Sequence, residues 1–257
     1  MRIKLSNITR KNHSLLLAYD QGLEHGPTDF NDQNVDPSYV LDIAEKGGFT
    51  GVILQKGVAE KYYHHKVPLV LKLNGKTNLL KGEPLSTQLC SVKQAVKLGA
   101  KAVGYTIYVG SAHEQVMFKE FHKIQSEAHD NELPVIAWMY PRGKAVKNPR
   151  SKKMLAYAAR IGLELGADFV KLYYPGSIES FKWVVKCAGK ARVLVAGGEK
   201  KGDKALLKRV NNIINAGGAG MAIGRNIWQH KEPLKITKAL KKIVFDNKSV
   251  SEALRCL

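Results

Sequence analysis

The sequence contains few cysteines, few acidic residues and no long apolar run. Its three cysteines, Cys90, Cys187 and Cys256, are far apart and form no C-x-x-C pair, which argues against a disulfide framework or a thiolate zinc site. No window approaches the roughly 18 apolar residues that a membrane span requires, and residues 1–12 are polar and basic without an apolar signal core. We therefore expect a soluble, cytoplasmic protein with no membrane partner.

Acidic residues are outnumbered, because 41 Lys and Arg stand against 22 Asp and Glu, which gives a formal charge of +19. Such an excess can indicate nucleic-acid binding, since Lys and Arg displace counterions from phosphates. The basic clusters here are short, at residues 152–153, 200–201 and 238–242, and they lack the interleaved aromatics of a single-strand platform. We expect no specific nucleic-acid partner and a surface that attracts anionic small molecules.

Eight short runs rich in Val, Ile, Leu and Ala alternate with helix-like stretches along almost the whole chain. Most runs are not polar at alternate positions, which is typical of parallel strands covered on both faces. The runs lie at residues 15–20, 51–55, 69–73, 102–108, 135–140, 168–173, 193–197 and 220–224. Stretches with helical apolar spacing lie at residues 91–98, 114–128, 151–165, 177–188 and 203–216.

The number of strands and the chain length both indicate a closed barrel. Eight parallel strands close a (β/α)8 or TIM barrel, and 257 residues match the roughly 250 of one such domain. We therefore expect an α/β protein with a single (β/α)8 domain over residues 1–257. Glycine pairs at 47–48 and 217–218, and Gly-Ala at 99–100 and 166–167, suit left-handed helix caps. The one long connection, residues 22–36, suits an active-site loop.

Lys171 is the only cation in the apolar run 167–173. A solvated ammonium has a pKa of about 10.4 and is a poor nucleophile, whereas one held in an apolar lumen beside other cations loses its proton more easily and can attack a carbonyl. The alternative is a lysine whose stem reaches the strand end and keeps the ammonium in water. The place of this run as sixth of eight barrel strands favours the nucleophile.

In a (β/α)8 barrel the active site lies at the carboxyl ends of the strands. The first run ends in Asp20, and the fifth carries Trp138 and Tyr140 two residues apart on one face. An amine at Lys171, a phenol on the neighbouring strand and a carboxylate across the lumen can form a carbinolamine, dehydrate it to an imine and move protons at a carbon. Each partner also has a structural explanation, as packing, lumen filling or turn capping.

Glycines at the ends of the seventh and eighth strands predict a phosphate site. Barrel enzymes commonly hold a phosphate there through backbone N–H groups at the start of a short helix. Gly197, Gly198 and Gly224 permit close approach, and Arg225 adds charge before the helix-like stretch 226–229. A Gly-Gly pair alone is as typical of a tight turn, but the Ile-Gly-Arg sequence in the next unit favours the anion site.

Histidines at positions 25, 64 and 65 raise the alternative of a metal site and hence of zinc-dependent catalysis. No ligand set with three-histidine spacing is visible, and loop histidines are common without a metal. We therefore expect no metal and no cofactor.

Six motifs support a resemblance to a known family. They are LAYDQGLEHGP at 17–27, LKLNGKT at 71–77, GYTIY at 104–108, WMYPRG at 138–143, AGG at 196–198 and IGRNIWQ at 223–229. In their order and spacing they resemble the archaeal-type class I fructose-1,6-bisphosphate aldolases, nearly end to end. That resemblance implies a metal-independent aldehyde-lyase of glycolysis and gluconeogenesis on a (β/α)8 barrel, acting on a phosphorylated sugar and assembled as a homo-oligomer.

Carried over to this chain, the resemblance implies roles for four residues at the reacting centre. Lys171 forms the Schiff base with dihydroxyacetone phosphate, and Tyr140 is the principal proton donor and acceptor. Asp20 orients the nucleophile and assists proton movement, while Trp138 walls the site and restricts water around the imine.

The resemblance also implies two phosphate sites. The segments 197–198 and 224–225 match the pocket for the ketose 1-phosphate, and Arg142 is the choice for the distal phosphate. The chain departs from the family pattern at three places. Gln21 replaces a common histidine, residues 173–176 (YYPG) remove a small hydroxyl from the sixth loop, and Glu199 places an acid close to the expected phosphate, with lysines 200 and 201 able to offset it.

Two alternatives stay open. A related Schiff-base enzyme acting on another phosphorylated sugar, such as the aldol-transfer enzyme of archaeal aromatic biosynthesis, would use the same lysine and tyrosine. The loop sequence EHGP at 24–27 favours the sugar-bisphosphate branch. From a different class, a non-catalytic, basic barrel that binds nucleic acid would show salt-sensitive retardation of nucleic acid and no turnover.

Overall fold

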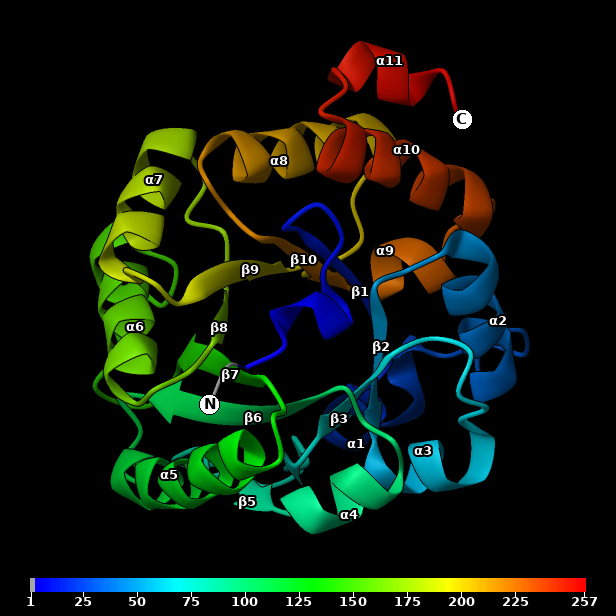
Figure 1. The fold of residues 1–257 in the computed structure, drawn as a ribbon. Helices are drawn as coiled ribbons and strands as arrows, with labels where there is room; N and C mark the ends of the chain where they lie inside the picture. The colour runs from blue at the N-terminus through cyan, green and yellow to red at the C-terminus, as the bar shows by residue number, and fades with distance from the viewer. Residues whose placement is uncertain (1–2) are drawn as a thin grey trace.

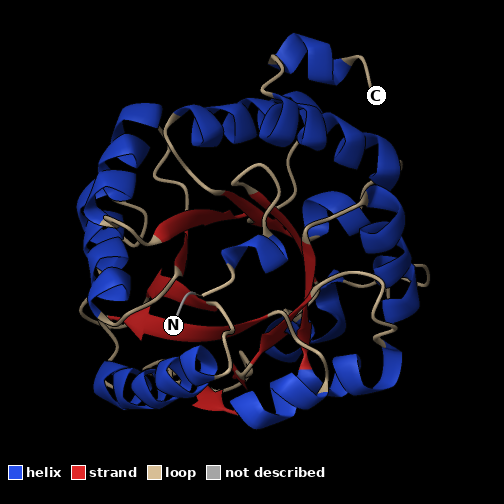
Figure 2. Ribbon diagram, in the orientation of Figure 1, coloured by secondary structure: helices blue, strands red, loops and turns tan. Residues whose placement is uncertain are grey.

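The computed structural model describes residues 3–257, in which eight parallel strands close into a barrel surrounded by helices (Figure 1, Figure 2). The order around the barrel is β1-β10-β9-β8-β7-β6-β3-β2. The strands are β1 (Ser14–Ala18), β2 (Gly51–Gln55), β3 (Leu69–Lys72), β6 (Ala102–Val109), β7 (Val135–Pro141), β8 (Phe169–Leu172), β9 (Arg192–Ala196) and β10 (Gly220–Ile223). The expected (β/α)8 barrel is confirmed, and each predicted run overlaps one of these strands.

Helices cover the outer face of the barrel, as Figure 2 shows. The main ones are α2 (Pro37–Gly47), α3 (Lys56–Tyr62), α4 (Val92–Lys97), α5 (Glu114–Asp130), α6 (Lys152–Glu164), α7 (Ile178–Cys187), α8 (Asp203–Asn215), α10 (Pro233–Asp246) and α11 (Val250–Leu254). None of the helices described over residues 3–257 combines the length and apolar character that a membrane crossing requires.

The helix ends follow local sequence rules. Asp36 caps α2 by accepting the backbone N–H of Ser38, and serines 91, 151 and 177 cap α4, α6 and α7 in the same way. Glycines 48, 99, 166 and 217 all have φ between 63° and 87°, which is the left-handed conformation that turns a helix back toward the next strand. The predicted glycine caps are therefore confirmed.

The lumen of the barrel has its own apolar core, separate from the core between strands and helices. The short helix η1 (Leu5–Ile8) lies at the centre of the ring in Figure 1. Ile8 is fully buried in the lumen cluster, and the Ser14 hydroxyl at the start of β1 donates to the Ile8 carbonyl at 2.8 Å. The amino-terminal segment thus packs into the end of the barrel opposite the carboxyl ends of the strands.

The connections after β1 and β3 are more regular than the sequence indicates. Residues 22–36, expected as an active-site loop, begin with two single-turn helices, α1 (Gly22–His25) and η2 (Gly26–Asp29). Gly26 joins them with a φ of 68°, which glycine adopts without strain. After β3, the two-residue strands β4 (Asn74–Gly75) and β5 (Thr87–Gln88) pair antiparallel. Both connections lie over the carboxyl end of the barrel, where they border the site described next.

Candidate active site

One pocket at the carboxyl ends of the strands collects every residue predicted from the sequence for catalysis or phosphate binding. These residues are Asp20, Trp138, Tyr140, Arg142, Lys171, Gly197, Gly198, Gly224 and Arg225. They come from β1, β7, β8, β9 and β10 or from the segments that directly follow these strands. The barrel therefore brings together residues that are up to about 200 positions apart in the chain.

Lys171 lies within β8 and is only 5% exposed. It is paired in register with Trp138 on β7, and its Nζ atom lies 4.7 Å from the centroid of that indole ring. Burial lowers the pKa of Lys171 to about 8; Asp20 opposes this shift and Lys72 adds to it. The amine is therefore far easier to deprotonate than a solvated lysine, as a nucleophile requires.

The Trp138 ring owes its position to a glycine on the neighbouring strand. A Cβ atom on Gly104 of β6 would lie only 2.0 Å from the ring, so no larger residue fits there without moving the indole. The ring is 1% exposed and belongs to the lumen cluster. Its Nε1 atom is buried and has no hydrogen-bond partner among residues 3–257. The indole thus forms a fixed apolar wall beneath Lys171.

Tyr140 lies two residues beyond Trp138 on the same face of β7. Its ring stacks on Tyr173, with centroids 4.8 Å apart and an interplanar angle of 14°. Desolvation, together with the neighbouring Tyr173, Asp20 and Glu24, raises the pKa of Tyr140 well above its ordinary value. The phenol therefore stays protonated at neutral pH and can donate a proton inside the pocket.

Asp20 follows β1 and faces a second buried lysine. Its Oδ2 atom lies 3.7 Å from Nζ of Lys72, the last residue of β3, which is 6% exposed. Lys72 was not predicted as a site residue. The signal was present, because Lys72 is the only cation in the apolar run 69–73, just as Lys171 is in its own run.

The expected phosphate region is formed by β9, β10 and their following turns. Gly198 has a φ of 70°, and a Cβ atom on Gly224 would lie 2.6 Å from the Ala18 carbonyl oxygen. These two positions require glycine for different reasons, the first for conformation and the second for close approach. The Arg209 guanidinium donates to the Gly197 carbonyl at 2.8 Å, which fixes the backbone of this turn.

Asn226 links the turns after β9 and β10. It is 2% exposed, accepts the backbone N–H of Lys201 at 2.9 Å and donates to the Glu199 carbonyl at 3.1 Å. The Glu199 side chain is exposed and does not line the pocket. Glu199 directly follows Gly198, and the expectation of an acid close to the phosphate site stays a prediction. The Lys200 ammonium donates to the Gln229 carbonyl at 2.8 Å.

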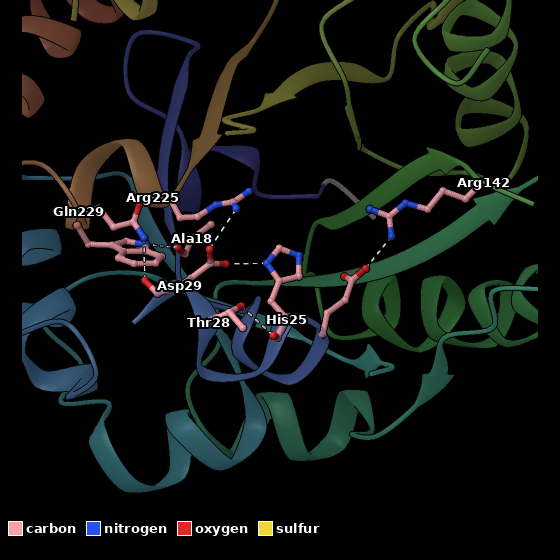
Figure 3. Close-up of polar contacts among 9 residues, drawn as sticks. Ala18, His25, Thr28, Asp29, Arg142, Arg225 and Gln229 are labelled. Atoms are coloured by element: carbon pink, nitrogen blue, oxygen red, sulfur yellow. Dashed lines mark hydrogen bonds and ion pairs between the residues drawn. The ribbon is translucent and has the colours of Figure 1, made fainter. Parts of the chain in front are cut away.

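The α1–η2 segment pairs with both arginines expected to bind phosphate, as Figure 3 shows. Arg142 donates to Glu24 at 2.6 Å and to the Tyr173 hydroxyl at 3.0 and 3.2 Å. Arg225 donates to Asp29 at 3.2 Å, and the other oxygen of this carboxylate lies 2.7 Å from the His25 ring. Neither pairing, of Glu24 or of Asp29, was predicted from the sequence.

The histidines considered as metal ligands lie apart in the structure. His25 borders the pocket and bonds Asp29, whereas His64 lies near Asp42 and Glu45. Among residues 3–257, this last trio is the one group whose ligand atoms lie close enough together for a metal. It does not line the pocket that contains Lys171, so it offers no metal to the reacting centre.

The chain is similar in sequence to known aldolases over nearly its whole length. A curated relative from Thermoproteus tenax, "Fructose-bisphosphate aldolase class 1", is 50% identical over 248 residues, covering 95% of this chain and 94% of that protein. A relative from Methanocaldococcus jannaschii, "Fructose-bisphosphate aldolase/6-deoxy-5-ketofructose 1-phosphate synthase", is 39% identical over 268 residues, covering 96% and 86%.

A solved structure shows the same fold. It is an archaeal fructose-1,6-bisphosphate aldolase with its catalytic Lys covalently bound to the carbinolamine intermediate of the substrate. It superimposes with a TM-score of 0.91 at 50% identity, covering 93% of this chain and 97% of that one. The resemblance to archaeal-type class I aldolases is thereby confirmed. The sequence profile of the DeoC/LacD family aldolases matches residues 14–230, and the chain belongs to this family.

Proposed function

We propose that the protein is a class I fructose-1,6-bisphosphate aldolase, which cleaves this sugar reversibly to dihydroxyacetone phosphate and glyceraldehyde 3-phosphate without a metal. The observation that supports this most is the buried Lys171 amine over the Trp138 ring, in the same pocket as Tyr140, Asp20 and the glycine turns after β9 and β10. An amine with a pKa of about 8 is a competent nucleophile near neutral pH.

In the cleavage direction, neutral Lys171 attacks the C2 carbonyl of the open-chain sugar to give a carbinolamine. Loss of water, with a proton supplied by Tyr140, gives the protonated imine. The Tyr140 phenolate left by that step takes the C4 hydroxyl proton, which breaks the C3–C4 bond; the bond electrons move into the iminium to form an enamine, and glyceraldehyde 3-phosphate leaves. Tyr140 returns this proton to C3, and hydrolysis of the imine releases dihydroxyacetone phosphate and restores Lys171.

The other pocket residues have supporting roles in this proposal. Asp20 orients the lysine and assists proton movement, and Trp138 limits water around the imine. The turns at Gly197–Gly198 and Gly224–Arg225 hold the 1-phosphate, where backbone N–H groups and one guanidinium offset its charge. Arg142 binds the distal phosphate, for which it exchanges its present partner Glu24.

We further propose that residues 1–257 act as one catalytic domain, in a cytoplasmic homo-oligomer that needs no cofactor. The low cysteine content is typical of a reducing compartment.

A coupled assay tests the function directly. Purified protein should cleave fructose 1,6-bisphosphate, more efficiently than fructose 1-phosphate, and the activity should survive excess chelator. If chelation abolishes turnover and a divalent metal restores it, the imine mechanism is wrong. If fructose 1,6-bisphosphate is not cleaved at all, the substrate assignment fails.

A second candidate activity is favoured by one comparison. The Methanocaldococcus jannaschii relative carries two activities in its name, so a second phosphorylated-sugar reaction on the same lysine is worth testing. Two parallel assays, one for formation of 6-deoxy-5-ketofructose 1-phosphate and one for cleavage of fructose 1,6-bisphosphate, show whether the protein has one of these activities or both.

A further inference from the structure

Arg209 is a half-buried arginine of α8 to which the reaction scheme above gives no role. One nitrogen of its guanidinium, Nη2, donates to the Gly197 carbonyl, while its buried Nε atom has no hydrogen-bond partner among residues 3–257. The arginine ion pairs in this part of the chain are those of Arg142, Arg160 and Arg225. Arg209 is therefore a cation that is partly removed from water without a carboxylate to compensate it.

The electrostatic surroundings of Arg209 disfavour its charge. Burial, and to a smaller extent the charge of Arg150, lower the pKa of Arg209, and Tyr174 opposes them. A guanidinium nevertheless keeps its proton in a protein, so the side chain stays positive. An anion bound nearby would supply the compensation that the described residues do not.

Arg209 and Asn226 together occupy the carbonyl groups of the turn after β9. Arg209 bonds the Gly197 carbonyl, and the Asn226 amide donates to the Gly198 and Glu199 carbonyls at 3.5 and 3.1 Å. In a trans peptide unit the carbonyl and the following N–H point in opposite directions, and the N–H groups of residues 198 and 199 bond no backbone acceptor among residues 3–257. Since Gly197 and Gly198 line the Lys171 pocket, these N–H groups are available to a ligand there.

The charge of Arg209 lies close to that position. A Cβ atom on Gly198 would be 3.8 Å from Nη1 of the guanidinium. From standard peptide and hydrogen-bond dimensions, a phosphate oxygen that accepts the Gly198 N–H lies at most about 8 Å from Nη2. At an effective dielectric constant of about 20, a unit charge at this distance changes an association constant about thirtyfold, and solvent screening reduces the effect toward tenfold.

We propose that Arg209 is a positioning residue for the 1-phosphate: it holds the Gly197–Gly198 peptide unit with its N–H toward the pocket, and its uncompensated charge attracts the phosphate from behind that turn. This inference rests on the proposed function. It adds to the pocket residues an arginine that lies outside the pocket and acts through the backbone.

Trapping of the imine on Lys171 tests the proposal at the site itself. The full-length protein and its variants are reduced with borohydride in the presence of either dihydroxyacetone phosphate or dihydroxyacetone, which lacks the phosphate. In Arg209→Gln, which keeps an N–H donor but loses the charge, the second-order rate constant for the phosphorylated ketone should fall about tenfold. The rate constant for dihydroxyacetone should stay at the wild-type value, which a merely structural defect would not allow.

Two further variants separate the charge from other effects. Arg209→Lys keeps the charge and should trap dihydroxyacetone phosphate at nearly the wild-type rate. Arg160→Gln is the matched control, because this exposed arginine of α6 pairs with Glu164 and does not line the pocket; it should change neither rate. In steady state, Arg209→Gln should raise the KM for fructose 1,6-bisphosphate about tenfold and leave kcat within about twofold, as expected for loss of uniform binding.

The proposal is overturned if Arg209→Gln traps both ketones as wild type does, or if it loses both equally. Should Arg209→Gln fail to fold, a tenfold loss of dihydroxyacetone phosphate trapping in Arg209→Lys would overturn it as well, and a wild-type rate in that variant would support it.

Failure of the proposed function gives a different result, because the wild-type protein would then form no adduct with either ketone. In that case calorimetric titration with inorganic phosphate decides the role of Arg209, in proteins that also carry Arg142→Gln to remove the expected distal site. About tenfold weaker phosphate binding on adding Arg209→Gln would support the inference, and equal binding would contradict it.

Discussion

The Nζ atom of Lys171 lies 4.7 Å from the centre of the Trp138 ring on the adjacent strand. The ring face attracts the ammonium form, while burial favours the neutral amine. Burial dominates, because the pKa of Lys171 falls to about 8. A lysine balanced in this way can react as an amine and then carry the positive charge of the iminium against an aromatic face.

The first prediction concerns pH. Imine formation requires neutral Lys171, so its rate should rise with pH, tenfold per unit while the amine is mostly protonated, and level off above about pH 8. Rapid-quench borohydride trapping with dihydroxyacetone phosphate measures this step alone. A rate that continues to rise through pH 10 would show that the lysine is solvated.

The second prediction concerns Tyr140. Tyr140→Phe keeps the stacking on Tyr173 but removes the hydroxyl, so the imine should still form while proton transfer slows by about 10² to 10⁴. Turnover and borohydride-trapped adduct, measured side by side, separate the two steps. Tyr173→Phe is the control, because its hydroxyl contacts Arg142 and its loss should slow proton transfer far less. Equal losses in the two variants would remove Tyr140 from the proton path.

The third prediction concerns the space beneath the indole. Gly104→Ala places a Cβ atom 2.0 Å from the Trp138 ring, so the ring must move and the free energy of unfolding should fall by about 1 to 3 kcal/mol, with activity lost. Denaturant unfolding measures the first effect. Gly57→Ala on α3 is the control, because a Cβ atom there meets nothing within 4 Å and alanine favours a helix. An unchanged stability of Gly104→Ala would mean that the ring is not fixed.

The fourth prediction concerns the stability cost of the nucleophile. The folded-state pKa of Lys171, about 8, lies below the unfolded value of about 10.4, so the unfolded chain binds the proton more tightly than the folded one. Burial of Lys171 therefore lowers the free energy of unfolding, and this loss is fully present below pH 8. Lys171→Met should therefore raise the free energy of unfolding at pH 7 by about 3 kcal/mol. The gain should shrink as the pH rises toward 10.

Thermal or denaturant unfolding at two pH values checks this dependence. Lys93→Met, on the exposed face of α4, is the control and should change the free energy of unfolding by less than about 0.5 kcal/mol. A Lys171→Met protein less stable than wild type at pH 7 would contradict the inference that burial of the Lys171 amine destabilises the folded protein.

The barrel could be predicted because its signals are local. Each strand is covered on both faces and is therefore apolar along its length, and the helices carry serine and glycine caps within one or two residues of their ends. Lys171 was identifiable for the same reason, since a single cation in a buried run stands out. Lys72 carries the same local signal as the only cation in the run 69–73, so it too could be predicted as a site residue.

The charged contacts over the pocket could not be predicted in this way. Glu24 pairs with Arg142 across 118 residues and Asp29 with Arg225 across 196. Such pairs depend on how the α1–η2 segment crosses the open end of the barrel. No spacing in the sequence indicates them, because the distance between strand ends is a property of the closed sheet.

The most direct test of the account is to add borohydride together with dihydroxyacetone phosphate, in the presence of chelator, and to map the modified residue by peptide mass spectrometry. The account predicts one stable adduct of the reduced imine, located on Lys171, and none on Lys72. An unmodified Lys171, or an adduct on another lysine, would contradict it.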